Sequence, residues 1–344
     1  MPRNLKILLT GGGGFVGLNI AEALLRAGHE LSVLGNQEPP AYALATLSRL
    51  PGTLQLIDAD VSDREAVDAA FAQCGPSRVI HAAAITAGPE RELREIDRII
   101  DVNIKGAANV LSAALESGVE RAVYVSSGSV YGEALLGPGP LLESESVPVP
   151  DSLYSITKFA GERICTRLRA SGGLNVVCVR LGSVFGPWEF DTGVRDTLSL
   201  PLQILRKAMR CEEVVVAPQE PRRDWIYSRD VAAGVLSILH ASVVPHALYN
   251  LASGFSWTEV SSTWCACLRT EYAGLQCRTT RAGESANVSF LGERDRATMG
   301  IDRLIADLGF QPAFNRESAF ADYLAWISEH ATNFYEGNQR GAKQ

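Results

Sequence analysis

The sequence lacks the features of a membrane or nucleic-acid protein. No apolar run approaches the roughly 20 residues that span a bilayer, and no export signal precedes the first apolar segment. Lysine and arginine form no runs, and 32 basic against 39 acidic residues give a net charge of −7. A phosphate backbone would repel this charge. We therefore expect a cytoplasmic protein with neither a membrane nor a nucleic-acid partner.

Metal-binding residues are also scarce and scattered. The chain has five histidines and seven cysteines, and an odd cysteine number without an export signal favours reduced thiols. Cys265 and Cys267 are separated by one residue, which is not the CxxC spacing of zinc sites. We expect no bound metal.

The first half of the chain alternates strand and helix patterns. Apolar runs predict strands at 6–9, 30–34, 54–58, 78–81, 121–126 and 176–180, and helical periodicity predicts helices at 15–27, 63–74, 96–117 and 153–170. This order is typical of an α/β protein with a Rossmann-type, doubly wound parallel sheet, whose strands are covered by helices on both faces.

After residue 182 the pattern is looser, with helices expected at 200–210 and 229–240 and strands at 213–217 and 247–251. We therefore expect a dinucleotide-binding domain at 1–182, to whose sheet later strands near 213–251 return. A smaller C-terminal lobe at 183–332 would mainly bind substrate. Residues 333–344 are expected to form a flexible tail.

The segment TGGGGFVG at 10–17 lies between the first strand and the first helix. Gly11, Gly14 and Gly17 fit TGxxGxxG, while Gly12, Gly14 and Gly17 fit GxGxxG. Glycines allow the backbone to turn tightly and to approach a pyrophosphate, which then lies at the positive end of the helix. The segment predicts a dinucleotide site.

A second pattern, YSITK at 154–158, starts the helix that follows a proline-rich loop. Tyr154 and Lys158 are four residues apart and so share one helix face. A nearby cation favours the phenolate form of tyrosine, which could then exchange a proton with a substrate hydroxyl. The strand that ends in Ser126 and Ser127 would bring a hydroxyl to the same crevice.

These segments resemble those of the extended short-chain dehydrogenase/reductase family, specifically its NAD-dependent epimerase/dehydratase group. The resemblance covers nearly the whole chain and includes TGGGGFVG at 10–17, HAAA at 81–84, NIKG at 103–106, SSGSVYG at 126–132, YSITK at 154–158, RLGSVFGP at 180–187, RRDWIYSRDV at 222–231 and LGFQP at 308–312.

The resemblance implies a role for each matching residue. Tyr154 would be the acid/base and Ser127 the catalytic hydroxyl, with Ser126 as the adjacent alternative. Lys158 would tune Tyr154 and hold the nicotinamide ribose. Asn103 would help to position the Lys158 side of the site. The alternative is that Asn103 is only an amide in the interior of a helix. The cofactor contacts would be Gly11, Gly14, Phe15, Val16, Gly17, Asn36, Asp60, Val61, Ala82, Ala83, Ala84, Asn103, Tyr154 and Lys158.

The cofactor preference follows from the end of the second strand. NAD sites usually have an acid there for the ribose 2′-hydroxyl, whereas this chain has Gly35 and Asn36. No arginine stands beside them to favour NADP. Asn36 can form a hydrogen bond to a hydroxyl but has no positive charge to attract a phosphate. We therefore expect NAD as the cofactor, and NADP is the alternative. Asp60 is either the adenine contact or a helix cap before Ala66.

For the substrate, the resemblance implies Ser127, Arg223 and Arg296, with Arg294 as the alternative to Arg296. Ser183 is also expected at the substrate, and it stands where nucleotide-sugar members of the family generally have asparagine. Two guanidinium groups suit a diphosphate or a carboxylate. The competing interpretation is that Arg223–Asp224 and Arg296–Asp295 are surface ion pairs. Ala217, Pro218 and Gln219 stand where nucleotide-sugar enzymes of the family tend to have GDG.

The sequence therefore predicts an NAD(P)-dependent oxidoreductase or epimerase that transfers a hydride at a secondary alcohol of a sugar derivative, with nucleotide sugars among the candidates. The alternatives are a dehydrogenase/reductase of a small polyol, sugar acid or aldehyde, and a non-catalytic dinucleotide sensor. Sugar dehydration is excluded because Gly128 and Ser129 replace the acids it needs.

The resemblance also implies a homodimer through the helices at 96–117 and 153–170. Val110, Ala114, Ile156 and Ile164 could supply its apolar contacts, and burial inside the monomer would explain the same residues.

Overall fold

The computed structural model describes residues 4–190, 195–290 and 294–340. Its main feature is a seven-stranded sheet in the order β10-β6-β5-β4-β1-β2-β3, in which every neighbouring pair is parallel. The strands are β1 Lys6–Thr10, β2 Glu30–Gly35, β3 Thr53–Asp58, β4 Arg78–His81, β5 Arg121–Ser127, β6 Val176–Leu181 and β10 Leu248–Leu251. The predicted Rossmann-type sheet is confirmed.

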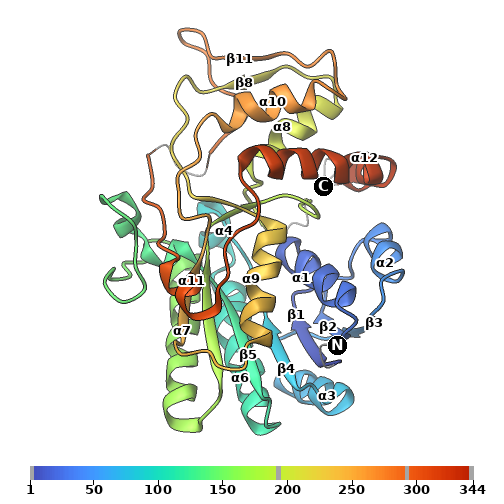
Figure 1. Cartoon of the computed structure of the whole chain (residues 1–344), viewed down its shortest axis with the longest axis vertical. Helices are drawn as coiled ribbons and strands as arrows, with labels where there is room; N and C mark the ends of the chain where they lie inside the picture. Colours follow the sequence, from blue (N-terminus) through green and yellow to red (C-terminus); the bar gives the residue numbers. More distant parts are fainter. Residues whose placement is uncertain (1–3, 191–194, 291–293, 341–344) are drawn as a thin grey trace.

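Helices cover both faces of this sheet, as Figure 1 shows. The side chains of β1 alternate between the faces, so that Ile7 and Leu9 belong to one apolar core and Leu8 to the other. The first core includes α1 Phe15–Arg26 and α9 Ser228–His240, and the second includes α3 Arg64–Cys74, α6 Gly106–Glu116 and α7 Leu153–Gly172. Burial on both faces explains why the strands are almost continuously apolar.

The strand order reverses next to β1, which lies between β4 and β2. In open parallel sheets, ligands bind in the crevice beyond the carboxyl ends of the strands at this reversal. The fold therefore places the glycine turn after β1 at the expected ligand position.

A smaller lobe lies beyond these carboxyl ends, in the upper part of Figure 1. It contains α8 Leu200–Met209, α10 Val260–Leu268 and a two-stranded parallel sheet of β8 Val214–Val216 and β11 Cys277–Thr279. A second small sheet pairs β7 Ser183–Phe185 with β9 Trp225–Tyr227. The Phe185 ring contacts Trp225, Trp257 and Phe320, so an aromatic cluster links β7 to the first residues of α12 Arg316–Arg340.

Several elements differ from the sequence expectations. The helix expected at 96–117 consists of α5 Ile96–Ile100, a π-helical turn at Asp101–Lys105 and α6. The helices α2 Ala41–Leu47 and α4 Pro89–Arg94 were not predicted, and α11 Asp302–Leu308 precedes the LGFQP segment. No helix in the described ranges is long and apolar enough to cross a membrane.

Two expectations in the second half need correction. Of the strands expected to return to the main sheet, β10 does so, but β8 pairs with β11 instead. The segment 333–340, expected as part of a tail, belongs to α12, which continues to Arg340. A single glycine costs a helix only about 1 kcal/mol and does not have to end it. Residues 341–344 lie outside the described residues.

Candidate active site

The turn between β1 and α1 is built for close backbone contact. Gly11 has φ +71°, and a Cβ at this position would lie 2.6 Å from the Ala83 nitrogen. A Cβ on Gly17 would lie 2.1 Å from the Gly11 oxygen. Gly14 is the N-cap of α1 and offers no side-chain acceptor, and the first turn contains no acid. The first N–H groups of α1 therefore suit an anionic ligand such as a dinucleotide pyrophosphate.

A cavity of about 1100 Å³ opens at the carboxyl ends of the strands and reaches into the smaller lobe. It is lined by nearly all of the predicted site residues: Gly11, Gly14, Phe15, Val16, Gly17, Asn36, Asp60, Val61, Ala82, Ala83, Ala84, Ser127, Tyr154, Lys158, Ser183, Arg223 and Arg296. Asn103 does not line it. Within the described ranges, no group of three or more His, Cys, Asp or Glu side chains could hold a metal ion.

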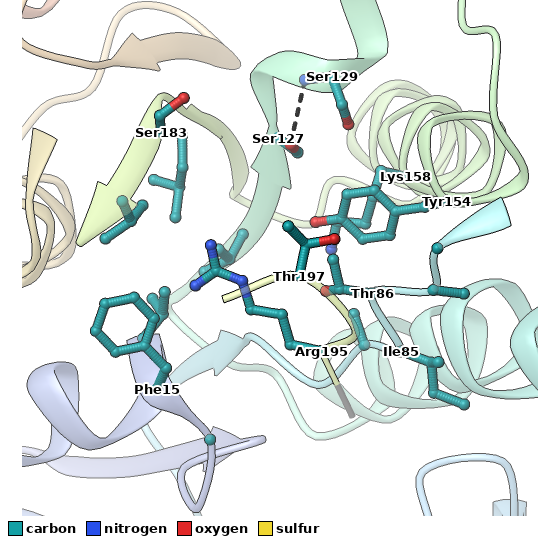
Figure 2. A pocket seen from close by; sticks show the side chains of 18 of the residues that line it. Phe15, Ile85, Thr86, Ser127, Ser129, Tyr154, Lys158, Ser183, Arg195 and Thr197 are labelled. Atoms are coloured by element: carbon teal, nitrogen blue, oxygen red, sulfur yellow. Dashed lines mark hydrogen bonds between the residues drawn. The ribbon is translucent and has the colours of Figure 1, made fainter. Parts of the chain in front are cut away.

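Tyr154 lies in the first turn of α7. Ser152 and Ser155 form a reciprocal capping box at this helix end, and Glu92 accepts a hydrogen bond from the Tyr154 N–H at 3.1 Å. Figure 2 shows the phenol facing the cavity beside Ser127 and Thr86. Burial raises the pKa of Tyr154, while hydrogen bonds from Ser127 and Thr86 and the charge of Arg195 act to lower it.

Lys158 lies one turn further along α7 and is 3% exposed. Its ammonium nitrogen is 4.5 Å from the centre of the Tyr124 ring, which is the geometry of a cation–π contact. Burial lowers the pKa of Lys158 to about 8. The lysine therefore keeps its charge at neutral pH, although the protein environment disfavours it.

The structure distinguishes the two adjacent serines. The Ser126 hydroxyl donates to Glu162 Oε1 at 2.6 Å, and Glu162 also forms a buried ion pair with Arg180 at 2.7 Å. Ser127 instead lies beside Tyr154 and accepts a hydrogen bond from the Ser129 N–H at 3.2 Å. The alternative of Ser126 as the reactive hydroxyl is therefore not supported by the geometry.

Asn103 lies behind the cavity wall in the π-helical turn and is 1% exposed. Its side chain accepts from the Ile85 N–H at 2.7 Å and donates to the Ile85 carbonyl at 3.0 Å. It also donates to Thr157 Oγ1 at 3.0 Å. The Asn103 amide therefore connects Ile85, the residue before Thr86, to Thr157 of α7, which lies between Tyr154 and Lys158.

Asp60 lies at the opposite end of the cavity, after β3. Its carboxylate accepts from Asn36 Nδ2 at 3.0 Å and pairs with Arg98 at 2.6 Å. The helix-cap alternative for Asp60 is wrong, because Asp63 is the residue that caps α3. A Cβ on Gly35 would meet no atom within 4 Å, so the missing acid at the end of β2 leaves open space beside Asn36.

Arg223 is 3% exposed and donates to the backbone carbonyls of Arg222 and Arg294 at 2.8 and 2.7 Å. Burial and the charge of Arg296 lower the pKa of Arg223 to about 10. The competing interpretation of Arg223–Asp224 and Arg296–Asp295 surface ion pairs is wrong: Asp295 pairs with Arg222 at 2.8 Å, and Asp224 is buried and accepts from Ser253 and Met299. Arg296 is half-buried, and two neighbouring cations, one of them buried, favour an anionic ligand between them. Arg294 also lines the cavity, so it remains an alternative partner.

The cavity residues that sequence reasoning missed include Thr86, Arg195 and Thr197. Thr86 follows the HAAA segment after one intervening residue, Ile85, so its place beyond the carboxyl end of β4 could have been inferred. Arg195 and Thr197 belong to an irregular segment without periodicity, and only the folded chain shows that it reaches the cavity (Figure 2).

The sheet, the glycine turn and the Ser127–Tyr154–Lys158 group define a dinucleotide-dependent oxidoreductase of the short-chain dehydrogenase/reductase class. The family model for the NAD-dependent epimerase/dehydratase family matches residues 7–252, and the chain belongs to this family. It is therefore an NAD-dependent enzyme of the extended short-chain dehydrogenase/reductase type, which works by hydride transfer.

Known proteins resemble the chain over nearly its full length. A dTDP-L-rhamnose 4-epimerase of Burkholderia thailandensis is 25% identical, with 94% of this chain and 95% of the relative covered. A probable dTDP-glucose 4,6-dehydratase of Sinorhizobium fredii is 26% identical, with 95% and 93% covered. The solved UDP-glucose 4-epimerase of Thermus thermophilus in complex with NAD is 25% identical, with a TM-score of 0.74 and with 94% and 98% covered.

Proposed function

We propose that this enzyme is an epimerase of a nucleotide-linked sugar that oxidises a secondary alcohol of the sugar and then reduces the resulting ketone from the other face. The observation that carries the proposal is that Tyr154 and Ser127 line the same cavity as the buried Arg223 and the half-buried Arg296. At about 1100 Å³ the cavity is larger than the 300–1,000 Å³ typical of one small ligand, which leaves room for a cofactor and a substrate.

The protein residues would perform the proton transfer. Tyr154 as phenolate takes the proton of the sugar hydroxyl, and Ser127 holds the same oxygen by a hydrogen bond. Lys158 keeps a positive charge one helical turn from the phenol. NAD, when bound, would supply the hydride-accepting and hydride-donating chemistry. The Thr86 side chain is also hydrogen-bonded to the Tyr154 phenol and so positions its hydroxyl.

The anionic part of the substrate would lie on the lobe formed by residues 183–332. Arg223 comes from the segment before β9, and Arg296 from the loop before α11. A diphosphate between them would relieve the repulsion that lowers the Arg223 pKa. Ser183, at the start of β7, lines the same region.

Dehydration of the sugar is not part of the proposal, although some relatives are named as dehydratases. Elimination needs a separate acid for the leaving hydroxyl. Gly128 and Ser129 follow Ser127, and neither can supply that proton. A Cβ on Gly128 would also lie 2.7 Å from the Met299 sulfur, so a larger residue there would require the Met299 side chain to move.

The proposed assembly is a cytoplasmic homodimer. Val110 and Ala114 are fully buried in the monomer, so they are not dimer contacts. Exposed apolar side chains instead lie on α4, α5 and α7, where Leu93 is 82%, Ile96 45% and Ile156 47% exposed. The seven free thiols fit a reducing compartment.

The test is a substrate screen with purified protein. UDP- and dTDP-linked sugars and free sugar acids are incubated with NAD or NADP, and products are followed by NMR and by the absorbance of reduced nicotinamide. We expect an epimerised nucleotide sugar with NAD and no accumulation of NADH. Steady NADH production from a free sugar acid would show that the enzyme is a dehydrogenase instead, and turnover of neither class would refute the proposal.

A further inference from the structure

The segment at 195–199 belongs to the smaller lobe but is held on the dinucleotide-binding side of the cavity. Arg195 forms a parallel bridge with Thr86, and the Asp196 N–H donates to the Thr86 carbonyl at 3.2 Å. The Asp196 carboxylate accepts from the Gly88 N–H at 2.8 Å and pairs with Arg91 at 3.3 Å. These contacts fix the backbone from which the Arg195 side chain enters the cavity.

The Arg195 guanidinium is fixed in turn by two contacts. Its central carbon lies 5.6 Å from the centre of the Phe15 ring, within the range of a cation–π contact. Its Nη1 lies 3.0 Å from Glu189 Oε1, and Glu189 is fully buried and accepts from the Ser199 N–H at 2.7 Å. The Arg195 side chain is nevertheless 31% exposed and lines the cavity.

Arg195 thus connects the two halves of the site. Phe15 is the first residue of α1, directly after Gly14, whose helix end has no side-chain cap. On the other side the charge of Arg195 acts on the Tyr154 phenol. Figure 2 shows the side chain between Phe15 and Tyr154. An anion at the start of α1 would therefore meet the helix N–H groups from one side and a guanidinium from the other.

We propose that Arg195 is a cofactor-holding residue that binds the pyrophosphate of the dinucleotide from the lobe side and slows its release. The proposal deepens the function above, because an epimerase must keep the reduced cofactor until the hydride returns to the same sugar. A guanidinium that retains the dinucleotide favours this return over net release of NADH.

The Arg195 guanidinium could instead bind a phosphate of the substrate, so the test distinguishes a cofactor phosphate from a substrate phosphate. The probes are NAD, ADP-ribose, adenosine and UDP, each titrated against the full-length protein by calorimetry, and NAD release is timed by stopped-flow fluorescence. The variants are Arg195→Gln and Arg195→Lys. Arg222→Gln is the matched control, because Arg222 is 62% exposed, pairs with Asp295 and does not line the cavity.

We expect Arg195→Gln to weaken NAD and ADP-ribose about tenfold, or about 1.4 kcal/mol, and to speed NAD release by a similar factor. Adenosine and UDP should stay within about twofold, as should every ligand in Arg222→Gln. Arg195→Lys should fall between wild type and Arg195→Gln, because it keeps the charge but loses the fork.

Loss of Arg195 leaves Glu189 as a buried carboxylate without its cation, which could disturb the fold. The double variant Arg195→Gln/Glu189→Gln removes that carboxylate charge, and the proposal requires the same weakening of NAD there. Unchanged NAD and ADP-ribose affinity, or a loss confined to UDP, would overturn the role of Arg195. These titrations measure binding and need no turnover. Either result therefore leaves the proposed epimerase activity unaffected, and that activity is tested separately by the substrate screen.

Discussion

At the scale of single residues, burial shifts the pKa values of several side chains in and near the site more than neighbouring charges do. It is the largest cause of the lowered pKa of Lys158, to about 8, and of Arg223, to about 10. It also lowers the pKa of His81 to about 3. The Nδ1 atom of this ring is hydrogen-bonded to the Thr10 hydroxyl at 2.7 Å. Each of these groups links proton binding to folding.

His81 gives the first prediction. Because its folded pKa lies far below the unfolded value near 6.5, the unfolded chain binds more protons as the pH falls below that value. Its contribution is fully present above pH 6.5 and is lost progressively towards pH 3. Between pH 6.5 and 5.5 the loss should be about 1 kcal/mol.

The measurement is urea unfolding of wild type and His81→Asn at several pH values. The variant is expected to be less stable at pH 8, where the ring is neutral in both states, but its stability should fall less steeply below pH 6.5. Parallel pH profiles would show that His81 does not remain neutral in the fold.

At the scale of elements, the join between β1 and α1 depends on the absence of side chains. A Cβ on Gly17 would lie 2.1 Å from the Gly11 oxygen and 2.7 Å from the Gly12 Cα, and neither backbone atom can move without disturbing the turn. Gly35 also lines the cavity, but a Cβ there meets nothing within 4 Å.

We therefore predict that Gly17→Ala destabilises the protein by about 1–3 kcal/mol and weakens NAD binding at least about tenfold. Gly35→Ala is the control and should unfold like wild type. Chemical denaturation and NAD titration measure both effects. If Gly17→Ala binds NAD as wild type does, close packing of this turn is not what creates the site.

The sheet strands were predictable because a buried parallel strand leaves a continuous apolar run, as in β5 and β6. The helix at 96–117 was predictable as a helical stretch but not as an interrupted one, since the π turn is fixed by contacts of Asn103 with Ile85 and Thr157 that lie far away in sequence. The strand that pairs with β8 could not be predicted from the sequence either. Strand pairing over the interval from Val214 to Cys277 depends on tertiary packing and leaves no local pattern.

At the scale of the whole molecule, two lobes close around one cavity and leave an apolar surface on α4, α5 and α7. Gly11, Ser127 and Tyr154, which the sequence identified, lie where strands end or helices begin, and local patterns place such positions. Arg195 comes from the lobe through a segment held by Thr86, Gly88 and Arg91, and a sequence contains no sign of such a contact.

The exposed apolar surface predicts a dimer. Wild type should sediment at twice the monomer mass at micromolar concentration, and Ile156→Asp should shift it to the monomer because the charge would be buried at the interface. Val243→Asp is the matched control, since Val243 is also exposed, at 69%, but lies after α9. A monomeric wild type, or equal sedimentation of all three proteins, would contradict this interface.

The central claim is that Tyr154 moves the proton as the sugar carbinol loses its hydride. The most direct measurement is rapid mixing of NAD-loaded enzyme with the nucleotide sugar found in the screen, in wild type and in Tyr154→Phe, with reduced nicotinamide followed by absorbance. The account predicts transient reduction in wild type and a rate at least about 100-fold lower in the variant, with NAD affinity within about twofold. Reduction of the cofactor at the wild-type rate by Tyr154→Phe would contradict it.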